Sequence, residues 1–563
     1  MGHLAHAKNN PVRHGQDAHA TVCNDQGMRP EKRAWGGLLP PQKTRLLLRR
    51  EMWGRSFPVT HDVIIIGGSF SGAATALLLR REVPGLRVAV VERSEEFDRK
   101  VGEATTEVSG AFLTRRLGLT RHLANHHITK QGLRFWFASG ASDPFERCTE
   151  IGSFYQVRMP SFQVDRQVLD QHVLDLAVAS GAELIRPAKV TAVETSPDQQ
   201  SVGITAEGGT RTLTSRWVID ASGRAALLAR KNGLLSPLPE HPTNSVWARF
   251  RGVKDLDGIE LRSRHPEFAR ACQASRSAAT NHLSGYGWWC WIIPLKGGDT
   301  SVGIVYNEDL FSLPPGGSLA SRLLAHVLAQ PVGRELFSGA EPVPGDAKAY
   351  SSLPYFSKEI AGPGWQIVGD AAGFQDPLYS AGLDFCAFTV SSAVSRIAAE
   401  SEGRPADYGD INARFLRSYH GWFQALYKDK YHYLGDAELM HAAFLMDIGW
   451  FYFGPVRELC TCPKGGFERF PFDGRIDGAV SRFMAFANRR LSKIARKRRA
   501  CGTYGRKNLD HRFIVKGFVP APPVLGQVWL GIKIWLRAEW GALFLRRPPE
   551  PAGEPQAAAS AAC

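Results

Sequence analysis

The sequence lacks the features that mark several common classes of protein. Its nine cysteines form no CxxC pair, so they indicate neither a zinc ribbon nor a disulfide framework. No stretch reaches the ~18 uncharged apolar residues that span a bilayer, because the most apolar one, 441–456, is short and contains Asp447. The first residues contain no apolar segment typical of a secretory signal. These absences predict a cytoplasmic protein without a structural metal.

Acidic residues are scarce in two segments only, although the formal net charge of the whole chain is +15. Residues 1–60 carry ten Lys or Arg against four Asp or Glu, and residues 489–512 carry ten against one. These two segments hold the entire excess, and the rest of the chain is neutral. The charge therefore predicts a local contact with an anionic partner and no nucleic-acid binding.

Residues 61–91 have the pattern of a βαβ unit. HDVIIIGG at 61–68 is typical of a buried strand that ends in glycines, AATALLLRR at 73–81 of a helix, and LRVAVV at 86–91 of a second buried strand. Parallel strands joined in this way need a sheet that is covered on both faces. The pattern predicts an α/β fold.

A glycine-rich turn joins the first of these strands to the helix. Gly67 permits a tight turn, Gly72 permits close packing of the helix, and the helix N-terminus offers free N–H groups to a pyrophosphate. Ser69 takes the position that is usually the middle glycine. Glu92 ends the second strand, where an acid accepts hydrogen bonds from a ribose. These residues predict a dinucleotide site, and the alternative is an ordinary βα turn.

Two later strands also end in an acid and a glycine. WVIDASGR at 217–224 contains Asp220, and IVGDAAG at 367–373 contains Gly369 and Asp370. Either site alone is a weak signal, because an Asp at a strand end often caps a helix. All three sites in this order predict a single dinucleotide at one sheet edge.

The order of GGSFSG, VDR (164–166), DASG and GDAAGFQDP resembles that of the FAD-dependent aromatic-hydroxylase and geranylgeranyl-reductase-like superfamily. Four further segments resemble the flavin-dependent halogenases, the tryptophan halogenase family, over roughly residues 61–401. They are VGEAT (101–105), ITKQGLRFWF (128–137), WCWIIP (289–294) and DPLYSAG (376–382). The WxWxIP string is the most specific of them.

This resemblance implies that reduced FAD, oxygen and halide yield hypohalous acid, which passes through a tunnel to a lysine near the substrate. Lys130 matches that lysine, and the alternative is a surface lysine at a strand entrance. An ammonium can hydrogen-bond hypohalous acid or form a haloamine, and burial lowers its pKa. Trp289 and Trp291 match a pair that keeps substrate from the flavin, with core packing as the alternative; their spacing places both on one strand face.

The resemblance also implies contacts with FAD. Gly102 and Glu103 lie near the isoalloxazine, Arg166 begins a helix that contacts the cofactor, and Ser380 belongs to a turn whose N–H groups hold halide and flavin. The complete cofactor-binding set is Gly67, Ser69, Gly72, Glu92, Gly102, Glu103, Arg166, Asp220, Gly369, Asp370, Pro377 and Gly382. Lys130, Trp289, Trp291 and Ser380 form the predicted catalytic set.

The predicted architecture is an FAD-binding Rossmann-like βαβ domain interleaved with a mostly antiparallel substrate sheet, followed by a helical C-terminal region. The boundaries are a disordered basic extension at 1–60, FAD-binding parts at 61–130 and 361–405, a substrate domain at 131–360 with interleaved FAD-binding segments at 160–230, helices at 406–547, and a disordered tail at 548–563.

The sequence departs from the family at two positions. Tyr379 stands where indole-halogenating members carry a glutamate, so we expect a phenolic or pyrrole-like substrate, free or carrier-tethered, rather than free tryptophan. Ala381 replaces a Ser or Thr at the expected halide site. Both departures favour the alternative of a non-halogenating FAD-dependent monooxygenase or reductase acting on a lipid- or polyketide-like substrate. A third interpretation is a membrane-associated flavoprotein with structural FAD.

The predicted partners are a halide ion and, because no second glycine fingerprint for NAD(P)H follows Gly382, a separate flavin reductase. At 524–547 apolar residues recur at helical spacing beside the basic run. Residues 489–547 are compatible with weak contact to an anionic membrane surface, with binding to an acidic carrier protein, or with a helix docked on its own core. Localisation is thus predicted as cytoplasmic or membrane-peripheral.

Overall fold

A computed structural model describes residues 59–462, 466–467 and 469–546. The tail predicted at 548–563 and all but the last two residues of the extension predicted at 1–60 lie outside the described residues. The ordered part begins with the predicted βαβ unit, in which β1 (Val63–Ile66), α2 (Phe70–Glu82) and β2 (Val88–Val91) follow one another.

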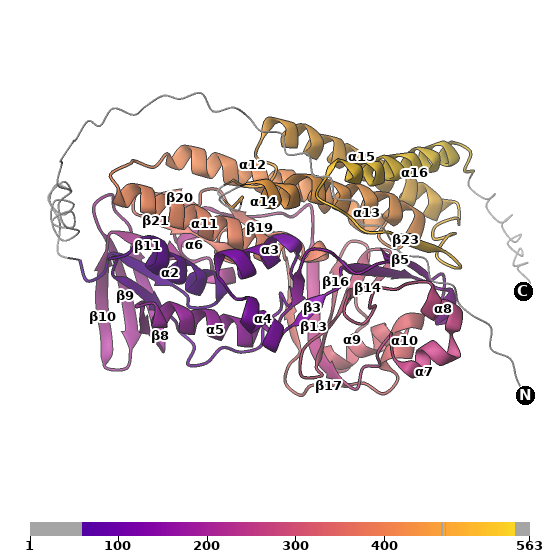
Figure 1. The fold of residues 1–563 in the computed structure, drawn as a ribbon, viewed down its shortest axis with the longest axis horizontal. Helices are drawn as coiled ribbons and strands as arrows, with labels where there is room; N and C mark the ends of the chain where they lie inside the picture. The colour runs from indigo at the N-terminus through magenta and orange to yellow at the C-terminus, as the bar shows by residue number, and fades with distance from the viewer. Residues whose placement is uncertain (1–58, 463–465, 468, 547–563) are drawn as a thin grey trace, which may run out of the picture. The chain divides into compact units, whose positions relative to one another are not determined.

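A six-stranded sheet holds the strands of all three glycine-and-acid motifs (Figure 1). Its strands are, in spatial order, β20 (Ala361–Gly362), β21 (Trp365–Ile367), β11 (Trp217–Asp220), β1, β2 and β7 (Glu183–Ile185). From β21 to β7 neighbouring strands are parallel, so their carboxyl ends share one edge. The Val and Ile side chains of β1 are buried on both faces, as the continuous apolar run predicts.

Helices cover this sheet and bring its motifs together. Helix α2 packs against α5 (Arg166–Ala179) and α11 (Gly382–Ser401). Asp165 caps α5 by accepting a hydrogen bond from the N–H of Gln167, which explains why that helix begins at Arg166. The predicted FAD-type α/β architecture is confirmed.

A nine-stranded sheet forms the second part of the fold, as predicted for the substrate region. Its main path is β17 (Glu341–Pro342), β13 (Thr243–Arg251), β16 (Thr300–Asn307), β15 (Trp288–Pro294), β14 (Thr280–Gly285), β4 (Leu133–Phe137), β5 (Thr149–Ser153) and β23 (Arg512–Val515), and β18 (Lys348–Tyr350) pairs with β13. Most pairs are antiparallel, but β4 with β14 and β5 with β23 are parallel.

Smaller elements complete the described part of the chain. Three short sheets contain β8 (Ala188–Glu194), β9 (Gln200–Ala206) and β10 (Gly209–Ser215); β12 (Leu235–Pro237), β19 (Tyr355–Ser357) and β22 (Gly373–Phe374); and β3 (Ile128–Lys130) with β6 (Ser161–Gln163). The shorter helices are α3 (Glu107–Ala111), α4 (Thr120–His126), α6 (Leu227–Lys231), α7 (Ile259–Arg264), α8 (Pro266–Arg270), α9 (Leu319–Leu328), α10 (Pro331–Phe337) and α14 (Arg457–Thr461).

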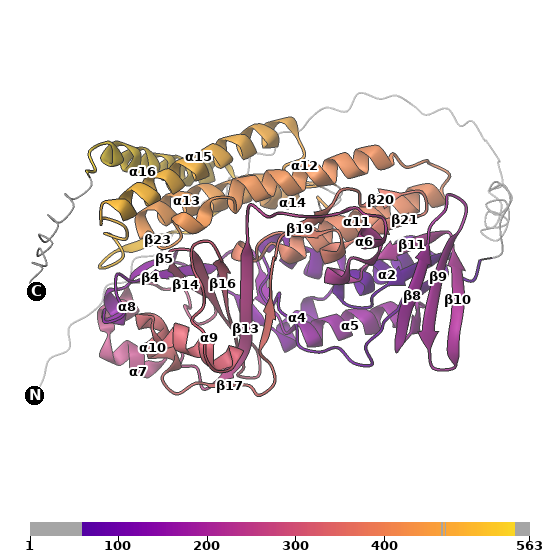
Figure 2. The same cartoon turned by 180° about the vertical axis from the view of Figure 1, so that it is seen from behind.

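The C-terminal region consists of long helices that lie along both sheets (Figures 1 and 2). They are α12 (Tyr408–Leu426), α13 (Ala437–Phe451), α15 (Arg475–Ala500) and α16 (Leu525–Leu543). Helix α12 contacts β20 of the first sheet, and α13 contacts β5 of the second. Strand β23 was not predicted, because its partner β5 lies far away in sequence and RFIV alone is too short to signal a strand.

Helix α16 docks on α13 and α15, as one of the three interpretations predicts. Its buried face consists of small residues around one tryptophan, namely Gly531, Trp535, Ala538 and Ala542. Val528, Ile532 and Ile534 also pack against the core. Five other apolar side chains point to solvent: Leu525, Trp529, Leu536, Trp540 and Leu543 are 41–68% exposed. No helix in the described part of the chain is long and apolar enough to cross a membrane.

A buried ion-pair cluster ties neighbouring strands of the nine-stranded sheet to the loop before β14. Arg134 and Arg276 both contact the Glu150 carboxylate, at 2.5 and 2.9 Å, and all three side chains are at most 1% exposed. Burial works to raise the pKa of Glu150, but the two guanidinium groups overcome it and hold the pKa below its usual range. The cluster is stable only while the charges compensate one another.

We expect Glu150→Gln to lower the free energy of unfolding by about 3–5 kcal/mol, because two buried guanidinium groups lose their counter-ion. Chemical denaturation of the purified protein measures this change. Asp510→Asn is the matched control, since Asp510 pairs with Arg147 at the surface, where both side chains are 53% exposed. The control should leave the unfolding midpoint unchanged. An equal change in the free energy of unfolding of the two variants would contradict the role of Glu150 as a buried counter-ion.

Candidate functional site

The three glycine-and-acid motifs meet at the carboxyl edge of the six-stranded sheet. Gly67 has a φ of +99°, and a Cβ atom there would lie 2.5 Å from the carbonyl oxygen of Ala221 in the second motif. Gly369 has a φ of +62°, and a Cβ atom there would collide with the Ser71 side chain of the first motif. Gly72 packs against the carbonyl of Gly67 with no room for a Cβ. The glycines thus permit the close contact on which convergence depends.

The turn after β1 has the properties of an anion-binding site. Helix α2 starts beyond Ser69 with no side-chain cap and no acidic residue in its first turn. Its first N–H groups therefore face the sheet edge with the positive end of the helix dipole. Glu92 lies beside the turn, where its carboxylate accepts hydrogen bonds from the N–H groups of Gly68 and Ser94 at 2.7 and 2.9 Å.

Two cations gather beside this turn. Arg166 donates to Asp170 at 2.9 Å, and Lys100 donates to Ser69 at 2.8 Å and lies 3.6 Å from Asp170. Gly102 passes so close to Arg166 that a Cβ atom would lie 2.9 Å from the guanidinium. Lys100 and Asp170 were missed in the sequence, because neither belongs to a glycine motif, although Asp170 stands four residues after Arg166 on α5.

The two later strand-end acids differ in what their carboxylates contact. Asp220 accepts hydrogen bonds from the N–H groups of Ser222 and Leu228, so it stabilises its own loop and helix α6. Asp370 lines a small cavity together with Gly382, at the start of α11. Burial raises the pKa of Asp370, while Arg166 and Arg224 act in the opposite direction. Asp370 therefore lies at the shared edge itself. Asp220 acts indirectly, because it stabilises the backbone of the loop that follows its strand.

Glu103 connects this edge to the nine-stranded sheet. Arg249 on β13 donates to Glu103 at 2.6 Å and to Asp165 at 2.8 Å. Burial raises the pKa of Glu103 to about 7, although the nearby Arg249 charge works against the rise. This cluster holds the VGEAT segment, and Gly102 with it, against the start of α5.

The segment from Pro377 to Gly382 forms a strained turn before α11. Tyr379 and Ser380 both have positive φ angles, 71° and 64°, which are uncommon for residues other than glycine. Asp376 holds the turn: its carboxylate accepts hydrogen bonds from Leu378 N–H at 2.9 Å and from Tyr431 at 2.6 Å. Gly382 has open space where a Cβ would point. Strain of this kind is typical of functional turns.

Lys130 lies at the end of β3 against the same turn. Its Nζ donates to the Thr105 carbonyl at 2.9 Å and to Ser380 Oγ at 3.4 Å. The side chain is 2% exposed, so it is not a surface lysine. Burial lowers the pKa of Lys130 to about 8, while the carboxylates of Glu107 and Asp384 act to raise it. The amine therefore titrates near neutral pH.

Trp289 and Trp291 share one face of β15, as their alternation predicts. Their ring centroids are 5.9 Å apart, and both rings are buried. Trp289 donates to the Tyr431 hydroxyl at 3.0 Å, and Tyr431 in turn holds Asp376. The tryptophan pair is thus linked to the strained turn by hydrogen bonds, and it does not line the large cavity described next.

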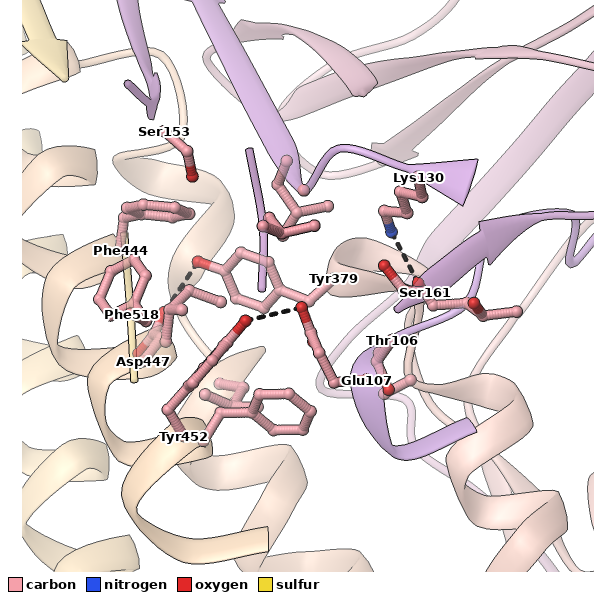
Figure 3. A pocket seen from close by; sticks show the side chains of 18 of the residues that line it. Thr106, Glu107, Lys130, Ser153, Ser161, Tyr379, Phe444, Asp447, Tyr452 and Phe518 are labelled. Atoms are coloured by element: carbon pink, nitrogen blue, oxygen red, sulfur yellow. Dashed lines mark hydrogen bonds between the residues drawn. The ribbon is translucent and has the colours of Figure 1, made fainter. Parts of the chain in front are cut away.

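A cavity of about 680 Å³, its open mouth included, lies between the nine-stranded sheet and the C-terminal helices. Figure 3 shows Lys130 on one side of it, Asp447 on the other, and Tyr379 between them. The apolar wall comes mainly from the C-terminal region, through Trp422, Leu426, Phe444, Ile448, Phe451 and Phe518. Because Lys130 and Tyr379 lie on its wall, the cavity and the cofactor edge share the strained turn.

Two polar pairs in this cavity were missed in the sequence. Tyr452 donates to Glu107 at 2.8 Å, and Tyr379 donates to Asp447 at 2.8 Å. Glu107 stands next to the VGEAT motif, so its position was a usable signal. In the sequence, Asp447 stands out only as a charge within the apolar stretch 441–456. A charge in such a stretch is a usable signal for a buried functional residue.

These residues fit FAD. The uncapped start of α2, the glycines without room for side chains and the cations Lys100 and Arg166 match a pyrophosphate. Glu92 supplies an acceptor at the position of a ribose, and the uncapped start of α11 offers N–H groups to a flavin oxygen or an anion. Among the described residues, no group of three or more His, Cys, Asp or Glu is placed to hold a metal.

The sequence profile of the tryptophan halogenase family matches residues 62–146 and 140–432. A flavin-dependent halogenase, chlA, from Dictyostelium discoideum is 27% identical over 419 residues, covering 68% of this chain and 67% of its own length. The tetracycline 7-halogenase of Kitasatospora aureofaciens is 26% identical, covering 57% and 60%. The curated relatives are thus matched over about two thirds of their length or less.

Solved structures share the fold. The crystal structure of halogenase PltM in complex with phloroglucinol and FAD has a TM-score of 0.68 at 18% identity, covering 85% of this chain and 96% of its own. The flavin-dependent brominase Bmp2 has a TM-score of 0.55 at 22% identity, covering 76% of this chain and 99% of its own.

We expect Gly67→Ala to weaken FAD binding by about 10- to 100-fold, because the methyl group pushes the turn away from Ala221. Titration of apoprotein with FAD, followed by flavin fluorescence, measures this. Gly208→Ala is the control: its φ of +93° imposes the same backbone strain, but nothing lies within 4 Å of the added methyl group. Equal FAD affinity in the two variants would contradict the placement of the cofactor.

Proposed function

The chain belongs to the tryptophan halogenase family, and on that premise we propose that it is a flavin-dependent halogenase. It uses reduced FAD, oxygen and halide to halogenate an electron-rich aromatic compound. The observation that carries this proposal is the contact of buried Lys130 with Ser380, which joins a reactive amine in the large cavity to the strained turn at the cofactor edge. A monooxygenase that transfers oxygen directly does not need such an amine.

Bound FAD, once reduced, supplies the two electrons that activate oxygen and so lets halide be oxidised to hypohalous acid. The residues of the protein bind and position the cofactor and the halide, and they confine the oxidant. The amides at the start of α2, together with Lys100 and Arg166, hold the pyrophosphate, and Glu92 holds the ribose. The amides at 381–382 and the Ser380 hydroxyl hold the halide, which compensates for the hydroxyl that Ala381 lacks. Asp220 and Glu103 stabilise the backbone segments near these binding groups.

Lys130 directs the hypohalous acid to the substrate. In its ammonium form it donates a hydrogen bond to hypohalous acid. In its neutral form its nitrogen attacks the halogen, so that a haloamine forms as the oxygen–halogen bond breaks and water leaves. A pKa of about 8 makes both forms accessible near neutral pH. The Thr105 carbonyl fixes the direction of the amine. Trp289 and Trp291 close the space beside the turn, so that substrate does not reach the flavin.

The substrate is a small aromatic molecule, which we propose to be phenolic or pyrrole-like. Tyr379 occupies the place of the glutamate that indole halogenation uses, and the cavity wall is aromatic and aliphatic. The substrate is either free or tethered to a carrier protein. A separate reductase delivers reduced FAD.

Purified protein with FAD, a flavin reductase, NADH and a phenol should give a product whose mass rises by one halogen only when chloride or bromide is present. A hydroxylated product in halide-free buffer would contradict the proposal and favour a monooxygenase.

Lys130→Ala should reduce halogenation by at least about 100-fold while FAD affinity stays unchanged, because the oxidant is no longer aimed at the substrate. Product formation by mass spectrometry and FAD titration measure the two quantities. Lys189→Ala, on the exposed side of β8, is the matched control and should keep full activity. Retained halogenation in Lys130→Ala would remove the role assigned to this lysine.

We further propose that α15 and α16 contact an anionic lipid surface. Along α16, Leu525, Trp529, Leu536, Trp540 and Leu543 recur at intervals of three, four or seven residues and form one exposed apolar stripe. Contiguous apolar surface of this kind marks an interaction site.

Positive charge lies next to this stripe. Lys533 lies over the Trp529 ring at 5.4 Å, and Arg537 is exposed on the same helix. Helix α15 runs beside α16 and exposes Lys493, Arg496 and Lys497 near its end. Tryptophan beside lysine and arginine suits the interface of a membrane with anionic lipids better than the acidic surface of a carrier, which would leave the tryptophans unused.

The double variant Trp529→Ser/Trp540→Ser should lose most of its binding to vesicles of phosphatidylcholine and phosphatidylglycerol in equal amounts, measured by co-sedimentation. Binding of the unaltered protein should fall when phosphatidylcholine alone is used, because the charge attraction is lost. Ile259→Ser, at a 77% exposed position on α7, is the control. Absence of vesicle binding, or a dimer by light scattering that the double variant breaks, would contradict the proposal.

A further inference from the structure

One carboxylate of the large cavity has a role that the halogenation chemistry described above does not use. Asp447 comes from α13, beyond the end of the family match at residue 432. We propose that Asp447 is the residue that binds the substrate hydroxyl, by accepting a hydrogen bond from a phenolic O–H. This inference rests on the proposed function for the identity of the substrate, and it rests on the cavity for the geometry.

The two oxygens of Asp447 have different environments. Oδ2 accepts hydrogen bonds from the Tyr379 hydroxyl at 2.8 Å and from Lys430 at 2.5 Å. Oδ1 is buried and has no hydrogen-bond partner among the described residues. An unpaired buried carboxylate oxygen is costly, and proteins seldom leave one without a protein, water or ligand partner. Asp447 lines the cavity, so a substrate hydroxyl that turns this carboxylate slightly toward the cavity supplies the missing donor.

Lys430 is the counter-ion of this carboxylate inside the protein. Burial raises the pKa of Asp447 and lowers that of Lys430, while the ion pair between them and the hydrogen bond from Tyr379 favour the charged carboxylate. Both partners of the ion pair are at most 1% exposed, so water screens their attraction little. An ionised acceptor binds a hydroxyl more strongly than a neutral one does.

The neighbours of Asp447 select the kind of donor. The Lys430 ammonium repels a second cation, which disfavours an amine at Oδ1. The rings of Phe444 and Phe518 lie beside Asp447 in the cavity (Figure 3), so an aromatic substrate packs against them while its hydroxyl reaches the carboxylate. A neutral phenol satisfies both requirements.

The position of Asp447 also suits the chemistry at Lys130. Figure 3 places the two residues on opposite sides of the cavity with the Tyr379 ring between them, so a ring held at Asp447 packs beside Tyr379 in the same cavity as the amine. A phenol that donates a hydrogen bond to a carboxylate gains electron density on its oxygen, which makes the ring carbons ortho and para to it better nucleophiles. Asp447 thereby supplies from α13 the carboxylate that Tyr379 does not provide at the turn.

Binding of resorcinol and of 1,3-dimethoxybenzene to the FAD-loaded protein tests this inference. The two probes differ in that only resorcinol donates hydrogen bonds. By calorimetry, the unaltered protein should bind resorcinol more tightly. Asp447→Asn should weaken resorcinol binding by about 10- to 100-fold and leave dimethoxybenzene binding unchanged, because only the charged hydrogen bond is lost.

A second variant guards against a folding defect, since Asp447→Asn leaves Lys430 buried without its counter-ion. Asp447→Leu/Lys430→Met removes both charges and replaces them with apolar side chains of similar shape, a change that buried ion pairs often tolerate. It should lose the preference for resorcinol while FAD affinity stays normal. A preference for resorcinol that persists in either folded variant, or that is absent from the unaltered protein, overturns the inference. Normal resorcinol binding without any halide-dependent product would instead overturn the proposed function alone.

Discussion

The strained turn between β22 and α11 is the constraint on which the site depends. Tyr379 and Ser380 adopt left-handed backbone conformations, each at a cost of about 1–3 kcal/mol that the surroundings must offset. Asp376 holds the turn from the side of the tryptophan pair, and Asp447 holds it through the Tyr379 hydroxyl from the side of the cavity. Because the same turn begins α11 and carries the contact to Lys130, it couples the cofactor edge to the cavity.

On the proposed function, chemistry and substrate selection are encoded in different parts of the chain. The glycine motifs, Lys130 and the strained turn lie within the residues that the family profile matches. Phe444, Asp447 and Phe518, which form the far wall of the cavity, lie beyond them. A shared oxidant-generating core can therefore serve different substrates when the C-terminal helices differ, which agrees with function residing in sites built on a common fold.

The cofactor edge could be predicted from the sequence because each motif meets a local requirement. Gly67 needs a positive φ, and Glu92 stands at a strand end whose position follows from the apolar run before it. The same rule did not separate Glu92, which accepts from the N–H of Gly68 in the glycine turn, from Asp220, whose two acceptor bonds both come from the segment that follows its own strand. That difference depends on how the loop folds back, which no local pattern records.

The cavity wall could not be predicted, for a related reason. Helix α13 is buried on almost every side, so no periodicity marks the face that lines the cavity. The partners of Asp447, Tyr379 and Lys430, come from other segments and meet it only in the folded chain. The exposed stripe of α16 was visible as a helical pattern, but the small residues opposite it, which make the actual contact with the core, carry a weaker signal.

The central claim is that one turn serves both the cofactor and the halogenating amine. A crystal of the protein grown with FAD and soaked in bromide tests it most directly, through the anomalous signal of the bromide. We predict flavin density along the edge that contains Gly67, Glu92 and Asp370, and a bromide peak at the amides of Ala381 and Gly382. Flavin bound elsewhere, or a turn occupied by neither FAD nor bromide, would contradict the account.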